Sequence, residues 1–275
     1  MVKTSLHSTG AAPRTRIRSL LAFAVVSVGA CAPRPSETGD TVTILAYNIH
    51  HGEGMDSVID LDRIADLILE ADPDLVTLQE VDSVAERTGG VDQARVLGEL
   101  TGMHAAFGRF MEYQGGAYGM AVLSRWPMES ITNWRLSDGE EPRTALGITV
   151  RTPGDQELVL VGIHFYRTEE ERLSQAADLE RFLQTETSPV VLAGDFNSLP
   201  DSDVIRRLEA GWTVLQKGED RLTFPSWAPE REIDFVLLRP AERFEVVRHR
   251  PLNEPVISDH RPVLTEVVLR RAGQE

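Results

Sequence analysis

The sequence predicts an α/β protein whose single folded domain spans about residues 42–270. Three observations predict this class. Short β-branched, apolar runs alternate with amphipathic segments of helical spacing from residue 42 onward. No internal repeat, low-complexity block or mid-chain linker separates a second domain. Polar residues also recur where the apolar runs end, and strand ends are where α/β sheets place their sites.

The first three predicted elements are a strand, a helix and a strand. Residues 41–49 (TVTILAYNI) are β-branched and apolar, which predicts a strand. Residues 60–74 carry apolar side chains at helical spacing, and Pro73 ends that helix. Residues 74–81 form a short apolar run that contains Glu80, which is typical of a buried strand.

Two further helices lie among the later strands. A helix over residues 92–102 is closed by Gly102. Thr168 and Glu171 have the spacing of a capping box, at the start of a helix that runs to Leu183. The remaining predicted strands cover residues 103–110, 118–125, 144–151, 157–165, 189–196, 231–238 and 261–269.

The chain is acidic, with 28 basic and 43 acidic residues and a formal net charge of −15. After residue 31 the only lysine is Lys217, and the arginines are dispersed among acidic residues. Non-specific binding to nucleic acid depends mostly on clustered Lys and Arg, so this charge opposes it. A small phosphorylated substrate, held by a local site or a metal ion, is still compatible with it.

The amino terminus has the pattern of an export signal. Arg14, Arg16 and Arg18 precede an apolar run over residues 20–30. This run is too short to cross a bilayer as a helix, which needs about 20 residues. Residues 1–30 are therefore predicted to be a signal peptide and residues 31–41 a tether.

Cys31 is the only cysteine, and it directly follows the letters VGA. This arrangement resembles the lipobox of bacterial lipoproteins, in which the signal is cut before a cysteine that then carries lipid. The alternative is a plain signal peptide with an incidental thiol. One cysteine allows no intrachain disulfide despite the predicted export. We expect an exported, monomeric protein of the bacterial cell envelope, anchored through lipid on Cys31 and otherwise periplasmic or secreted.

Polar side chains stand at the ends of most of the apolar runs. Any one of them alone is a capping or turn residue as often as a functional one. Buried polar groups need partners, however, so a placement repeated in six segments predicts that they converge on one another or on an ion. The residues are Asn48, Glu80, His164, Asp195, Asn197, Asp234, Asp259 and His260.

These segments also match a family pattern. YNIHHG, LQEV, YGMAVLSR, EPRTAL, GIHF, GDFN, REIDFVLL and SDHRPV resemble, in order and roughly in spacing, the endonuclease/exonuclease/phosphatase (DNase I-like) superfamily. The resemblance spans residues 42–269. It implies a four-layered α/β sandwich, with two mixed β-sheets packed face to face and helices outside. It also implies hydrolysis of a phosphoester by an activated water molecule.

The resemblance assigns a metal site to three residues. Glu80 matches the main metal-binding carboxylate of the family, Asn48 offers an amide oxygen beside it, and Asp259 stands where the family has a further metal-associated carboxylate. Oxygen ligands of this kind suit Mg²⁺ or Mn²⁺.

The resemblance also assigns the catalytic residues. Asp195 orients or deprotonates the attacking water, and Asn197, two residues further along an extended segment, contacts a phosphate oxygen. His260 contacts the phosphate while Asp234 holds its ring in one tautomer. His164 is a second phosphate-contacting histidine that acts on the leaving group.

One motif residue has two possible roles, and two other positions depart from the family pattern. Arg143 is expected to support the phosphate, with a structural salt bridge as the alternative. Met120 stands where many relatives carry Asn, which removes a substrate contact there. His50 stands where abasic-site nucleases tend to have Asp, so it argues against that branch; it is expected to border the pocket and contact substrate.

Two other hydrolase classes fit the sequence less well. A zinc site on His50, His51 and Glu53 is disfavoured, because adjacent residues of a strand point to opposite faces and the helical H-E-x-x-H pattern is absent. A Ser-His-Asp hydrolase using Ser258 or Ser198 lacks the G-x-S-x-G elbow.

The sequence therefore predicts a phosphodiesterase or phosphatase that depends on Mg²⁺ or Mn²⁺ and acts on a small or lipid-linked phosphoester at the cell envelope. Its only contact with the membrane is the predicted lipid anchor. A DNA endonuclease or exonuclease of the same superfamily is the alternative, for which four tryptophans are candidate base-stacking residues. A catalytically inactive envelope binding module is the alternative from a different class.

Overall fold

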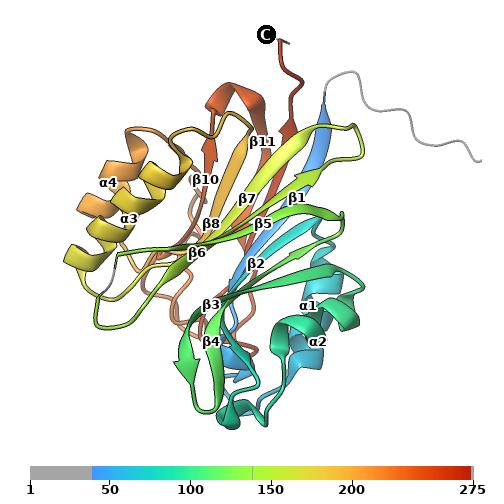
Figure 1. Cartoon of the computed structure of the whole chain (residues 1–275), viewed down its shortest axis with the longest axis vertical. Coiled ribbons are helices and arrows are strands. Elements are labelled where there is room, and N and C mark those ends of the chain that lie inside the picture. Colours follow the sequence, from blue (N-terminus) through green and yellow to red (C-terminus); the bar gives the residue numbers. More distant parts are fainter. Residues whose placement is uncertain (1–38, 138, 274–275) are drawn as a thin grey trace, which may run out of the picture. The chain divides into compact units, whose positions relative to one another are not determined.

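A computed structural model of the chain describes residues 39–137 and 139–273, which contain two six-stranded mixed β-sheets (Figure 1). In spatial order, the first sheet consists of β11 (Phe244–Pro251), β12 (Val263–Leu269), β1 (Asp40–Asn48), β2 (Leu75–Ser83), β4 (Gly116–Ser124) and β3 (His104–Tyr113). The second sheet consists of β5 (Met128–Arg135), β6 (Thr144–Arg151), β7 (Glu157–His164), β8 (Val190–Asp195), β10 (Asp234–Arg239) and β9 (Thr213–Val214).

Each sheet contains one parallel pair of strands, and these pairs position the polar residues. β1 pairs in parallel with β2, and β7 with β8. The carboxyl ends of parallel strands meet at one edge of a sheet. His164 is thereby the register partner of Asp195, and Asp234 of the antiparallel β10 is the partner of Asp195 on its other side.

Helices cover the outer faces of both sheets, so that the fold has four layers. An apolar cluster with members from both sheets fills the space between them, where β2 contacts β7 and β1 contacts β8. The predicted sandwich is confirmed. Two helices, α1 (Leu61–Ala71) and α2 (Gln93–Thr101), pack on the first sheet; α3 (Glu169–Leu183) and α4 (Asp203–Glu209) pack on the second (Figure 1).

Each α-helix begins at a side chain that caps its free backbone N–H groups. Asp60, Asp92, Thr168 and Ser202 each accept a hydrogen bond from the backbone nitrogen three residues later. The predicted cap at Thr168 is therefore present. Three short 3-10 helices, η1 (His50–Gly52), η2 (Glu86–Thr88) and η3 (Ala241–Arg243), lie in the connections.

β1 begins earlier than the sequence predicts. Asp40 and Thr41, assigned above to the tether, already pair with β12. The buried carboxylate of Asp40 accepts hydrogen bonds from Thr152 (2.6 Å) and Gln156 (2.9 Å), which fixes the start of the strand.

The predicted signal peptide, Cys31 and most of the predicted tether lie outside the described residues. Within residues 39–137 and 139–273, no helix has the length and apolar character needed to cross a bilayer.

Candidate active site

Asp195, the last residue of β8, lies at the centre of the polar cluster. Its carboxylate is buried and accepts a hydrogen bond from the backbone N–H of Asn197 (2.8 Å). The side-chain nitrogen of Asn48 donates to it from the opposite sheet (3.2 Å). Nε2 of His164 and Nε2 of His260 lie 3.4 and 3.7 Å from its Oδ2. Residues predicted from four separate segments thus converge on the carboxylate of Asp195.

Burial raises the pKa of Asp195 to about 7, because a carboxylate loses its hydration in this position. The His260 cation opposes the increase, while the charges of Asp234 and Glu80 add to it. A carboxyl group with a pKa near neutrality is suited to accept a proton from water at physiological pH.

His260 and Asp234 form the predicted imidazole–carboxylate pair. Nδ1 of His260 lies 2.9 Å from Oδ2 of Asp234, and both side chains are buried. Burial by itself disfavours the imidazolium, but the carboxylates of Asp234 and Asp195 outweigh it and raise the pKa of His260. The ring is therefore held as a cation that offers its Nε2–H toward Asp195.

His164 has the opposite electrostatic character. Burial, reinforced by the charges of Arg143, His260 and Arg167, lowers the pKa of its ring well below the usual value. It is therefore a neutral imidazole at pH 7. Within the described part of the chain, its buried Nδ1 has no hydrogen-bond partner.

Glu80 lines the same cleft as Asp195 and the two histidines His164 and His260, at a distortion of β2. The β2–β4 register shifts between Gln79 and Val81, and Glu80 has a left-handed φ of 57°. This conformation costs a non-glycine residue of the order of 1–3 kcal/mol and is typical of functional positions. The Asn48 amide nitrogen donates to Glu80 Oε1 (3.2 Å).

Two amides are oriented differently from what the resemblance implies. The oxygen of Asn48 accepts from the backbone N–H of His50 (3.1 Å), so the nitrogen of this amide, not the oxygen, faces Glu80. Asn197 is not on an extended segment: β8 ends at Asp195, and Asn197 has a φ of 48°. Its side-chain nitrogen donates to the carbonyl of Phe165 (2.9 Å). The metal role of Asn48 and the phosphate role of Asn197 stay predictions.

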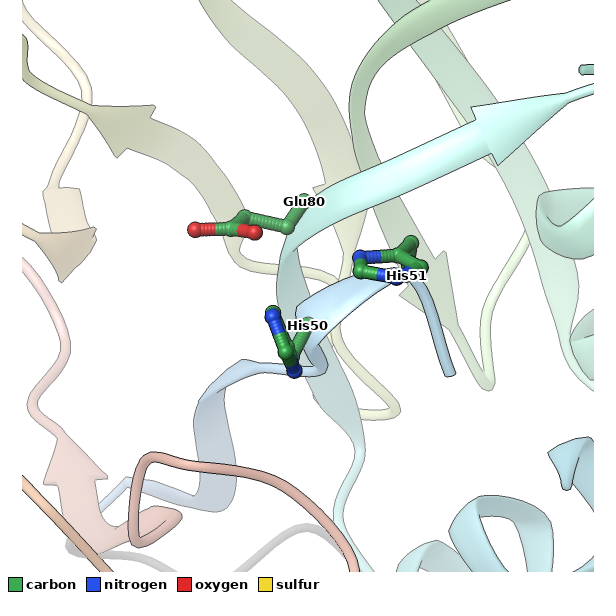
Figure 2. Close-up of side chains that lie close together, drawn as sticks. All are labelled: His50, His51 and Glu80. Atoms are coloured by element: carbon green, nitrogen blue, oxygen red, sulfur yellow. The ribbon is translucent and has the colours of Figure 1, made fainter. Parts of the chain in front are cut away.

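His50 and His51 do not point to opposite faces of a strand, so that prediction is wrong. β1 ends at Asn48, and both histidines lie in η1 with a left-handed φ of 46°. This turn brings the ring centroids to 4.5 Å from each other. Figure 2 shows both rings close to the carboxylate of Glu80, and one potential ligand atom of each residue lies within 4.8 Å of the others.

A cleft of about 450 Å³ opens over these groups. Arg143 enters it as a buried guanidinium, paired with Glu141 (2.8 Å) and 4.9 Å from the ring centre of Phe110. Among the described residues, no hydrogen-bond partner is found for its Nε and Nη1. Arg143 thus has both the predicted salt bridge and spare donors for a phosphate. His50 and Asp259 also line the cleft.

Several residues of the cleft were not predicted. Arg167 closely follows the end of β7, so its place after a buried strand could have identified it from the sequence. The others lie in β3, β4, η2 and the loops; Tyr118, Glu141, Arg231 and Ile233 fall within the family motifs but were not singled out there. They are Arg87, Met111, Tyr113, Tyr118, Glu141, Phe224, Arg231 and Ile233.

The positions of Met120, Ser258 and Ser198 bear on two sequence predictions: the substrate contact at residue 120 and the serine-hydrolase alternative. Met120 is fully buried in the core between the sheets and does not line the cleft. Ser258 is buried and donates its hydroxyl to the carbonyl of Asn48 (2.7 Å), while Ser198 is buried and donates to Phe196 (2.9 Å). Both hydroxyls have structural roles.

Comparison with known proteins shows the family. The sequence pattern of the Endonuclease/Exonuclease/phosphatase family matches residues 45–260. The chain belongs to this family. Its members act on phosphoesters as hydrolases and are generally dependent on divalent metal ions.

Similar proteins come from several bacteria. The uncharacterized protein YbhP of Escherichia coli K12 is 26% identical over 242 residues, which cover 82% of this chain and 96% of YbhP. A crystal structure of a family member from Beutenbergia cavernae has 25% identity and a TM-score of 0.67, covering 84% of this chain and 72% of that one. The mannosyl-6-phosphatase Bt3783 of Bacteroides thetaiotaomicron has 19% identity and a TM-score of 0.67, covering 83% and 100%.

The residues at the cleft fit a divalent metal ion. Glu80 and Asp259 are carboxylates that line the cleft, and His50 and His51 lie beside Glu80. When bound, such an ion supplies positive charge to phosphate oxygens and to the leaving oxygen.

Proposed function

We propose that the protein is a phosphoesterase that uses Mg²⁺ or Mn²⁺ and cleaves a small or lipid-linked phosphoester by attack of an activated water molecule. The observation that carries this proposal is the arrangement around Asp195: a buried carboxyl group with a pKa near 7, flanked by one cationic and one neutral histidine. Family membership supports the reaction class.

Each of these residues of the cleft has its own role in the reaction. Asp195 orients the water and accepts its proton. His260, kept cationic by Asp234, donates a hydrogen bond to a non-bridging phosphate oxygen, where negative charge develops. The neutral His164 and the spare donors of Arg143 contact the other phosphate oxygens. The proton balance closes when the leaving oxygen takes a proton from water or from a histidine.

The cleft favours a compact substrate. Its volume of about 450 Å³ is in the range of small-molecule sites. Trp126, Trp134, Trp212 and Trp227, which could have stacked on bases, are absent from its lining. The Bacteroides neighbour is named for a phosphorylated sugar. A small phosphoester is therefore preferred to a long polynucleotide, which needs a basic groove.

The test is a substrate panel with the purified protein. Sugar phosphates, inositol phosphates, a phosphodiester chromogen, sphingomyelin and plasmid DNA are each assayed with Mg²⁺, with Mn²⁺ and with EDTA. We expect metal-dependent turnover of a small or lipid-linked phosphoester, reduced at least 100-fold in His260→Ala. Turnover of plasmid DNA alone would favour the nuclease alternative. No turnover of any substrate with either metal contradicts the proposal.

We also propose that the protein is exported and anchored to the cell envelope through lipid on Cys31. The support is the sequence alone: an arginine-rich start, an apolar run of signal length and a single cysteine directly after it.

A further inference from the structure

We propose that His50 and His51 join Glu80 as ligands of one first-row transition-metal ion, such as Mn²⁺, Co²⁺ or Zn²⁺, in preference to Mg²⁺. This inference rests on the metal dependence in the proposed function. It narrows the choice of metal ion, because two imidazole ligands join the carboxylate. One ligand atom from each of the three residues lies within 4.8 Å of the others. Figure 2 shows η1 and β2 bringing the three side chains together.

The hydrogen bonds of His50 leave one ring nitrogen free for a metal. Its Nδ1 lies 3.1 Å from the carbonyl oxygen of Glu53, which can only accept a hydrogen bond. Nδ1 therefore carries the proton, and Nε2 keeps its lone pair. A metal-binding histidine usually donates its other ring N–H to a carbonyl or carboxylate in this way.

His51 has the complementary arrangement, set by the same residue. Its Nε2 lies 3.3 Å from the carboxylate of Glu53, so the proton is placed on Nε2 and the lone pair on Nδ1. That Nδ1 is buried and has no hydrogen-bond partner among the described residues. Gln93 donates to the backbone carbonyl of His51 (2.6 Å), which holds the turn in place.

The spacing of the rings fits a shared ion. Two imidazoles whose nitrogens lie about 2.1 Å from one metal have ring centroids roughly 4.6 Å apart at a right-angled ligand geometry and roughly 5.3 Å apart at a tetrahedral one. The centroids of His50 and His51 are 4.5 Å apart with an interplanar angle of 66°. Imidazole ligands suit first-row transition ions such as Zn²⁺, whereas Mg²⁺ takes oxygen ligands and keeps several waters.

One cation of the cleft, Arg87, is already neutralised by a carboxylate. Arg87 lines the same cleft, but its guanidinium makes two hydrogen bonds to the buried carboxylate of Asp82, at 2.7 and 2.8 Å. Arg87 is therefore not free to pair with the carboxylate of Glu80, whose Oε1 accepts a hydrogen bond from the Asn48 amide and which lies close to the two histidines.

The test measures metal binding rather than activity. The full chain is stripped of metal and titrated with Zn²⁺, Mn²⁺ and Mg²⁺ by calorimetry, and the Mn²⁺-loaded protein is examined by pulsed EPR for coupling to imidazole nitrogen. We expect nitrogen coupling in the unmodified protein. His50→Ala and His51→Gln should each raise the Kd for Zn²⁺ and Mn²⁺ at least about tenfold. Their Kd for Mg²⁺ should stay within twofold.

His104→Ala is the matched control, because His104 is an exposed histidine at the start of β3 and should leave every Kd unchanged. Melting temperatures measured without metal show whether each variant is folded. If His51→Gln fails to fold, the result for His50→Ala decides, because His50 is only half-buried. Absent nitrogen coupling, or an unchanged Kd in folded His50→Ala, overturns the inference. A nitrogen signal without hydrolysis of any substrate overturns the proposed function but still supports the metal site at His50, His51 and Glu80.

Discussion

Asp195 is the residue on which the proposed chemistry depends most, and its environment predicts how the rate varies with pH. The pKa of this carboxyl group is raised to about 7, mainly by burial, and the group must be ionised to accept a proton. We therefore expect kcat/KM to rise about tenfold per pH unit through the acidic range. The rise should level off at or somewhat below pH 7, because a bound cation lowers the pKa of Asp195. Rates at saturating metal between pH 4.5 and 8.5 measure this. A rate that increases on acidification contradicts the role of Asp195.

Individual site residues were predictable where a polar side chain ends a buried strand. His164 and Asp195 were found this way. Asp234 was found inside an apolar run and begins β10, and the structure brings the three together with His260. The orientations of side chains were not predictable. The contact between His50 and His51 depends on two consecutive left-handed residues, which no pattern in the sequence indicates. Arg143 was found only through its family motif.

The end of β8 also depends on a glycine. Gly194 has a φ of 145°, and a Cβ at this position would lie 2.1 Å from the carbonyl oxygen of Ile163 in the paired strand β7. We expect Gly194→Ala to lower the free energy of unfolding by at least about 2 kcal/mol, or Tm by roughly 4–8 °C, and to reduce activity because Asp195 follows directly.

Thermal unfolding measures this effect, with Gly211→Ala as the control. A Cβ at Gly211 meets no atom within 4 Å, so its change should stay within about 0.5 kcal/mol. Equal stability of the two variants would show that the close approach of β7 and β8 does not constrain the site.

The inner strands and longer helices were predictable because burial on one or both faces leaves an apolar pattern. β5 and β11 were not predicted, because both are edge strands whose residues are mostly exposed and polar. α4 and β9 were missed because both are short. The sandwich came from the family resemblance, since alternating strands and helices also fit a doubly wound sheet.

For the chain as a whole, the predicted anchor can be tested apart from catalysis. If Cys31 carries lipid, Cys31→Ser should move most of the protein from the membrane fraction to the soluble envelope fraction, because stable attachment depends on the acyl chains. Fractionation and immunoblotting measure this, with Ser198→Ala as a variant that should stay in the membrane fraction. Unchanged fractionation of Cys31→Ser removes the proposed anchor.

The acidic charge of the chain also bears on its substrate. With a net charge of −15, the protein has little long-range attraction for a polynucleotide, and binding must come from the cleft itself. The family includes enzymes of both kinds, so the choice between a small phosphoester and DNA depends on the cleft and not on the fold.

The most direct test of the account compares the unmodified protein with Asp195→Asn on the best substrate of the panel. The asparagine keeps the shape of the side chain and can still accept the N–H of Asn197, but it cannot take a proton from water. With equal metal content and an intact fold, we predict a loss in kcat of about 10²–10⁴-fold. Full activity in Asp195→Asn would contradict activation of water by this residue.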